Sequence, residues 1–115
     1  TFVTSCGHQN PASYCTFPRV LSTYVDEGLF EFEEAVRKMT GAPAERFGWS
    51  DRGFVREGCA ADLVVLDRSR LRDQASFESP VRFPTGIDQV LVNGVPVIDG
   101  DRYDANASAG QVLRC

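Results

Sequence analysis

The sequence predicts an α/β chain with helices in its first half and strands in its second. One observation is a set of apolar residues at helical spacing, Phe32, Ala35, Val36 and Met39. A second is the continuous apolar run at 63–66, which is typical of a strand. A third is Asn93-Gly94 between two valine-rich runs, the pattern of a tight β-hairpin. The character of the chain changes near residue 50.

Three helices are expected before that change. The first covers 17–25, with Pro18 near a first-turn position where its missing N–H costs nothing, and Gly28 marks its exit. The second covers 31–40, where acidic residues at the start and basic residues at the end suit the helix dipole. Gly41 is expected to end this helix in a left-handed conformation.

The third helix is short and covers 44–47, after Pro43 and before Gly48. The apolar stripe of the second helix is expected to lie in the core, at Phe32, Val36 and Met39. Trp49 is expected to pack at the junction between the helical and the strand-forming halves.

Two strands are expected before the hairpin, followed by an irregular stretch over 68–86. The first strand, 53–56, is short. The second, 63–66, is apolar throughout and is expected to be covered on both faces. Asp62 and Asp67 flank it and are expected to cap its ends.

The Asn-Gly turn also fixes the register of the hairpin. A two-residue turn gives three cross-strand pairs, Val92 with Val95, Leu91 with Pro96, and Val90 with Val97. The four valines then share one face, which is expected to be buried. Because Pro96 has no N–H to donate outward, the strand 95–98 is expected to be a sheet edge at that position.

Composition excludes several classes of protein. The net charge of -4 and the pI of about 4.9 leave no basic stripe for nucleic acid. No apolar run approaches the roughly 20 residues of a membrane span, so no membrane partner is expected. The 115 residues are too few for a barrel of eight βα units, which needs roughly 250. The chain begins in mid-pattern at Thr1 without a secretion signal, so we expect a fragment, a processed chain or a trimmed one.

Four cysteines are present, and none forms a C-x-x-C pair: Cys6, Cys15, Cys59 and Cys115. Disulfide-stabilised scaffolds are usually denser in cysteine, so free thiols in a reducing, cytoplasmic compartment are expected. A bridge between Cys6 and Cys15 remains the alternative.

Several motifs, in order, resemble one enzyme family. They are Thr16-Phe17-Pro18-Arg19-Val20-Leu21, Glu33-Glu34-Ala35-Val36-Arg37-Lys38-Met39-Thr40, Asp51-Arg52-Gly53, and Ala61-Asp62-Leu63-Val64-Val65-Leu66-Asp67. The segments 75–80, 86–87, 92–94 and 110–114 continue the match. The chain thus resembles, over almost its whole length, the carboxy-terminal end of N-acyl-D-amino-acid deacylases (D-aminoacylases), within the metal-dependent amidohydrolase superfamily.

The resemblance implies an architecture and a reaction. The family has a TIM-like barrel and a small β-sandwich built from both chain ends. Residues 1–50 would supply the last barrel strand and terminal helices, and residues 51–115 the carboxy-terminal sandwich strands. The family hydrolyses the amide of small N-acyl-D-amino acids, using zinc to activate a water. Its zinc ligands, mostly histidines, come from earlier strands, so no zinc is expected to be held here and the isolated chain is expected to be inactive.

One family position with a catalytic role falls within the chain. The family's Ser-Asp-Gly motif carries the Asp that acts as general base and acid, and this chain has Ser5-Cys6-Gly7, so the resemblance places Cys6 at the catalytic Asp position. Relatives often have His-Pro-Arg where this chain has Asn10-Pro11-Ala12, and Gly where it has Cys15. These departures cluster at the barrel mouth and put activity in doubt more than fold.

Other interpretations of the same residues are open. Cys6 and His8 share a face of a strand and could form a thiol nucleophile with its base, and with Cys15 they could bind a metal. An inert Cys6 is favoured over both, because no orienting group and no standard ligand spacing accompanies them. Arg19 could bind a substrate carboxylate, although local pairing is favoured. The alternative function is a non-catalytic β-rich binding or assembly module, with self-association through exposed strands.

Overall fold

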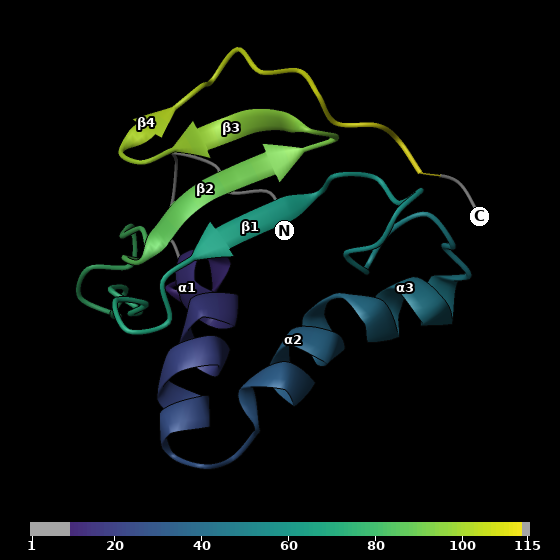
Figure 1. Ribbon diagram of the computed structural model, residues 1–115. Helices are drawn as coiled ribbons and strands as arrows, with labels where there is room; N and C mark the ends of the chain where they lie inside the picture. Colours follow the sequence, from purple (N-terminus) through teal and green to yellow (C-terminus); the bar gives the residue numbers. More distant parts are fainter. Residues whose placement is uncertain (1–9, 114–115) are drawn as a thin grey trace.

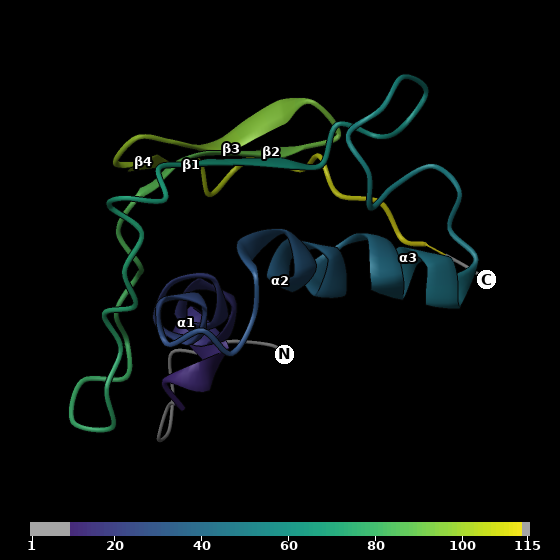
Figure 2. The same ribbon diagram turned by 60° about the horizontal axis from the view of Figure 1, so that its bottom comes forward.

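The computed structural model describes residues 10–113, which form two layers (Figures 1 and 2). One layer is an antiparallel sheet of four strands in the order β1-β2-β3-β4. The helices lie beneath one face of this sheet. The elements are α1 Ala12–Arg19, the π-helix η1 Val20–Tyr24, α2 Phe32–Met39, α3 Gly41–Phe47, β1 Leu63–Leu66, β2 Ile87–Val92, β3 Val95–Asp99 and β4 Arg102–Tyr103. The predicted order, helices first and strands second, is confirmed.

The first helix begins earlier than predicted. It starts at Ala12, whose backbone N–H donates to Asn10 Oδ1 at 2.9 Å. The helix is kinked at Cys15, where φ is -130° and ψ is 16°. Pro18 therefore lies in the first turn after the kink, where the helix tolerates its missing N–H. Gly28 has a φ of 74°, so its role as the helix exit is confirmed.

The predicted left-handed stop at Gly41 is wrong. Thr40 interrupts the helical conformation between α2 and α3 with φ -128° and ψ -83°, and Gly41 is the first residue of α3. Glycine is needed there for space, because a Cβ at this position would lie 2.8 Å from Phe54 Cε1. The left-handed end of α3 at Gly48, where φ is 72°, is confirmed.

The apolar stripe of α2 is buried only in part. Ala35 is completely buried, whereas Phe32, Val36 and Met39 are half-buried. The fully buried residues are few and mostly small, and Leu71 is the largest of them. The apolar core expected at the stripe therefore contains fewer buried side chains than predicted. Polar contacts then contribute more of the interactions between the elements.

The two strands expected before the hairpin have different outcomes. Residues 53–56 form bends, not a strand, because Gly53 has a φ of 86° and turns the chain against Ala44. β1 is confirmed over its predicted residues. The expected cover on both faces is not found among the described residues, since Val64 is 56% exposed and Val65 is 45% exposed.

The hairpin is confirmed at its turn and corrected beyond it. Asn93 and Gly94 both have positive φ, 48° and 81°, as a type I′ turn requires. The first two predicted pairs form, but Val90 pairs with Ile98 and not with Val97. A bulge places the extra residue just after Pro96, which cannot donate to a ladder.

The valine face and the sheet edge follow from this register. The valines expected to be buried together are at best half-buried, and Val95 is exposed. β4 pairs with the far end of β3, at Ile98 and Asp99. The predicted edge at Pro96 therefore holds among the described residues, while β4 covers the strand at Ile98 and Asp99.

Residues 67–86, called the arm below, leave the sheet between β1 and β2 and run down beside α1 (Figure 2). A single bridge joins Arg72 to Thr85 across the arm. Gly86 has a φ of 80°, and a Cβ there would collide with the backbone of Leu71. The arm is thus irregular, as predicted, but it is folded back on itself.

None of the helices within residues 10–113 has both the length and the apolar character that a membrane span requires.

Candidate functional site

An ion pair joins the arm to α1. Arg19 Nε donates to Asp73 Oδ2, and Arg19 Nη2 lies 3.5 Å from the Ala75 carbonyl oxygen. Asp73 Oδ1 accepts the Ala75 N–H at 2.9 Å. The Asp73 side chain is 7% exposed and that of Arg19 is 48% exposed. Burial alone would raise the pKa of Asp73, but the Ala75 N–H and the Arg19 guanidinium outweigh it and lower that pKa.

Cys15 lies beside this ion pair and contacts the other side of the arm. Its side chain is buried, and Sγ donates to the Arg82 carbonyl oxygen at 3.4 Å. Burial, together with the Asp73 carboxylate nearby, raises the pKa of the Cys15 thiol. A buried thiol with a raised pKa stays protonated and unreactive, so Cys15 serves as a packing residue.

A cavity of about 190 Å³ opens beside the ion pair. Its wall is built from α1 and the two residues before it, from η1 and from the arm: Asn10, Pro11, Ala12, Cys15, Thr16, Arg19, Val20, Tyr24, Asp73 and Phe77. The sequence departures at Asn10, Ala12 and Cys15 all fall on this wall. The structure therefore places these three positions on one wall, and their predicted place at a barrel mouth stays a prediction.

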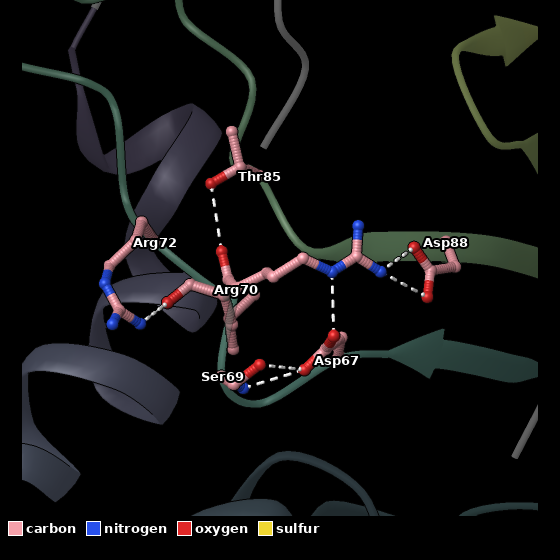
Figure 3. Close-up of polar contacts among 7 residues, drawn as sticks. Asp67, Ser69, Arg70, Arg72, Thr85 and Asp88 are labelled. Carbon is pink, nitrogen blue, oxygen red and sulfur yellow. Dashed lines mark hydrogen bonds and ion pairs between the residues drawn. The ribbon is translucent and has the colours of Figure 1, made fainter.

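Arg70 pins the base of the arm to the sheet (Figure 3). Its Nε donates to Asp67 at 2.7 Å and its Nη2 donates to both carboxylate oxygens of Asp88, at 2.8 Å and 3.0 Å. Asp67 also accepts the Ser69 N–H and hydroxyl, and with Arg70 these bonds hold the pKa of Asp67 far below its ordinary range. Thr85 closes the arm by donating to the Arg70 carbonyl oxygen at 3.1 Å. The cluster is exposed and structural in character.

Asp62 holds the other end of β1. Its Oδ1 accepts the Asn93 N–H at 2.8 Å, and its Oδ2 accepts from Arg52 Nη1 at 3.0 Å. Asp62 therefore ties the start of β1 to the hairpin turn, and Asp67 caps the other end. The predicted capping roles of both aspartates are confirmed.

The sequence-predicted site residues have mixed outcomes. Cys6 and His8 lie outside the described residues. Cys15 is a free thiol, and within residues 10–113 no group of three His, Cys, Asp or Glu residues is placed to hold a metal ion. Arg19 has its partner 54 positions away, so the expectation of a local partner is wrong. Asp73 was missed, because only the fold brings it to Arg19.

Trp49 packs as predicted at the junction of the two halves. Its ring stacks on Phe47 with centroids 5.1 Å apart. Its indole Nε1 is buried and has no acceptor among the described residues. A buried indole N–H usually finds a partner, so this junction is incompletely satisfied within residues 10–113.

Comparisons with known proteins agree on one family. Residues 11–98 match the model of the amidohydrolase family. The D-aminoacylase of Alcaligenes xylosoxydans xylosoxydans is 47% identical over 105 residues, which cover 90% of this chain and 22% of that enzyme. A solved D-aminoacylase with a binuclear metal centre is 46% identical with a TM-score of 0.81, over 86% of this chain and 21% of that one.

A further solved relative is the N-acyl-D-glutamate deacylase of Bordetella bronchiseptica, complexed with zinc and a phosphonate inhibitor. It is 41% identical with a TM-score of 0.78, over 85% of this chain and 20% of its own. The chain therefore spans about a fifth of the length of these relatives. The resemblance to D-aminoacylases found in the motifs is confirmed, and the chain belongs to the amidohydrolase family.

Proposed function

We propose that this chain forms the carboxy-terminal part of an amidohydrolase that cleaves the amide of N-acyl-D-amino acids, and that it is inactive alone. The observation that carries the proposal is the unequal coverage of the structural match, which spans most of this chain and only a small part of the solved enzyme. It covers 86% of this chain with a TM-score of 0.81, yet only 21% of the solved D-aminoacylase. Such a chain has the shape of one part of the enzyme.

The proposal extends to the architecture. Residues 1–50 would supply the last strand and terminal helices of a TIM-like barrel, and residues 51–115 the carboxy-terminal strands of a β-sandwich. The change from helices to strands after α3 supports this division. The exposed valines of β1 support a sheet that another layer or strand covers in the whole protein.

The described residues do not fit a catalytic zinc site. Such a site needs about three protein ligands and an open position. Residues 10–113 bring no three His, Cys, Asp or Glu side chains together. Because the relative from Bordetella bronchiseptica was solved with zinc, we assign metal binding to other parts of the enzyme and no catalytic step to zinc on these residues.

Cys6 is the proposed occupant of the general acid–base position. An Asp there would accept a proton from the attacking water and deliver it to the departing amine. A thiol is a poor base near neutral pH, with an ordinary pKa of about 8.5. Cys6 would therefore lower the activity of the whole enzyme, beyond the inactivity of the isolated chain.

The test is an assay of the purified 115-residue chain on N-acetyl-D-methionine with added zinc, beside a Cys6→Ala control. The expected result is no turnover by either protein. Zinc-dependent turnover by the chain above the control would overturn the proposed dependence on the rest of the enzyme.

A non-catalytic assembly module is the second candidate function. The observation that favours it is β1, which is an edge strand among residues 10–113 and whose Val64 and Val65 are both exposed. Edge strands of this kind pair with other chains. A stable chain that unfolds cooperatively and associates through β1 would favour such a module over a part of an enzyme, whereas a monomeric chain would count against it.

A further inference from the structure

Three residues of α1 contact the arm, two before or at the kink and one at the end of the helix. Arg19 reaches Asp73 and the Ala75 carbonyl oxygen. Cys15 donates to the Arg82 carbonyl oxygen. Tyr14 packs edge-on against Phe83 with ring centroids 5.8 Å apart. These partners come from both sides of the arm, so the arm holds α1 along one flank, as Figure 2 shows.

Asp73 is the residue on which these contacts depend most. One carboxylate oxygen accepts the Ala75 N–H and shapes the arm, and the other accepts from Arg19. A single side chain thus folds the arm locally and ties it to the helix. Because Asp73 is almost completely buried, its charge would be costly without these partners.

The kink at Cys15 lies between the contacts that hold α1. Residues 10–14 precede it, and Asn10, Pro11 and Ala12 among them line the cavity, while Arg19 follows it. The backbone at Cys15 is non-helical, with a φ of -130°, so contacts outside the helix fix how its two parts are oriented. The buried Cys15 thiol at the kink and the Arg19–Asp73 pair after it supply these contacts.

We propose that Asp73 is a positioning residue which, through Arg19, holds the kink at Cys15 and thereby orients residues 10–15. This segment follows the proposed catalytic position Cys6 by a few residues. The consequence for catalysis rests on the proposed function. The positioning itself is a property of this chain and can be measured without any activity.

The first test is alkylation of the full chain with iodoacetamide, followed cysteine by cysteine by mass spectrometry. Asp73→Asn keeps the shape of the side chain and removes its charge. Losing a hydrogen bond to a charged group favours local opening, and losing the carboxylate also removes a charge that raises the Cys15 pKa, so Cys15 is expected to react about tenfold faster. Arg19→Gln, which leaves this carboxylate in place, separates the two causes. Cys59, which lies outside this contact, is expected to keep its rate. The matched control is Glu34→Gln, which breaks an exposed ion pair on α2 and leaves Cys15 protected.

A second pair of variants is used if circular dichroism shows that Asp73→Asn does not fold. Arg19→Gln leaves the bond from Asp73 to the Ala75 N–H intact and is expected to expose Cys15 in the same way. Arg19→Lys retains a cation for Asp73 and is expected to restore much of the protection. A Cys15 rate unchanged in a folded Asp73→Asn or Arg19→Gln chain overturns the proposal.

The catalytic consequence is read in a chimera, a relative D-aminoacylase whose matching segment is replaced by this chain carrying Cys6→Asp. Arg19→Gln is expected to lower kcat about tenfold or more, because small displacements of a catalytic segment are costly, and to leave KM nearly unchanged. Arg19→Lys is expected to recover part of the loss. An unsubstituted chimera without activity counts against the proposed function only, since alkylation still decides the positioning. An active chimera with kcat insensitive to Arg19→Gln overturns the positioning role.

Discussion

The hairpin of β2 and β3 and the arm beside α1 are held by different kinds of interaction. The hairpin is fixed by a turn at Asn93-Gly94 and by a ladder between residues a few positions apart. The arm is fixed by the burial of Leu71 and by an ion pair between residues 54 positions apart. The hairpin therefore depends on its own sequence, and the arm depends on the rest of the fold.

The candidate site lies in the region that depends on the rest of the fold, not in the hairpin. The cavity and the buried Asp73 side chain both lie where the arm meets α1, away from the hairpin. We expect changes in the arm to leave the hairpin formed while they release α1.

The largest expected effect is that of Gly86→Ala at the base of the arm. The new Cβ would collide with the backbone of Arg70 and Leu71, at a φ that also disfavours alanine. The free energy of unfolding is expected to fall by about 3 kcal/mol, measured by urea denaturation. Hydrogen exchange is expected to show the arm unprotected while the hairpin amides keep most of their protection.

The matched control is Gly58→Ala, because Gly58 has a φ of 85° and open space around it. Only the cost of the left-handed conformation remains there, about 1 kcal/mol. Equal losses from the two substitutions would show that packing at the base of the arm contributes nothing. Equal loss of protection in the arm and the hairpin would show that the two regions unfold together.

A smaller effect is expected from Asp73→Asn, and it depends on pH. The folded-state pKa of Asp73 is lowered, so its carboxylate stabilises the fold above its ordinary pKa of about 3.9. That contribution is lost as the pH falls towards the folded-state value. Because Arg19 is half exposed, we expect a difference of only about 1 kcal/mol between wild type and variant at pH 7. Urea denaturation at pH 7 and pH 3 measures it.

Asp26→Asn is the control for this pH dependence, since residues 10–113 contain no ion pair of Asp26. It is expected to leave stability unchanged at both pH values. A difference between wild type and Asp73→Asn that persists undiminished at pH 3 would mean that the charge of Asp73 is not what stabilises the arm.

The smallest change in stability is expected in β1, the edge strand that pairs with β2 of the hairpin. Val64→Lys should alter the free energy of unfolding by no more than about 0.5 kcal/mol, because the side chain is exposed. It should nevertheless reduce self-association, since a charge on an edge strand opposes pairing. Light scattering is expected to show dimers or larger species for the wild type and smaller species for the variant.

Val55→Lys controls for the added charge, because Val55 is exposed in an irregular segment and not in a strand. It is expected to associate as the wild type does. A wild-type chain that is monomeric and unfolds cooperatively would remove β1 as an association surface.

The elements specified by neighbouring residues could be predicted from the sequence. The stripe of α2, the run of β1 and the Asn-Gly turn each carry their own signal, and each forms where expected. The bulge after Pro96 and the break at Thr40 were missed. Both result from contacts or missing donors that periodicity does not record.

The candidate site was less predictable than the fold. Arg19 and Cys15 could be singled out from motifs, but their partners come from the arm, far along the chain. Nothing in the local pattern around Asp73 marks it as buried or paired. Gly41 shows the same limit, since its need for space beneath Phe54 is visible only in the fold. Cys6 lies outside the described residues, so its catalytic position stays a prediction.

The most direct measurement is the activity of the chimera in which this chain replaces the matching segment of a relative D-aminoacylase. With zinc occupancy matched, kcat/KM on N-acetyl-D-methionine is compared for the chimera and for its Cys6→Asp form. General acid–base catalysis contributes roughly a hundredfold to ten-thousandfold, and the departures at Asn10, Ala12 and Cys15 should limit the gain to part of that range. A folded, zinc-loaded chimera that stays inactive in both forms would contradict the proposal that this chain is a working part of such an enzyme.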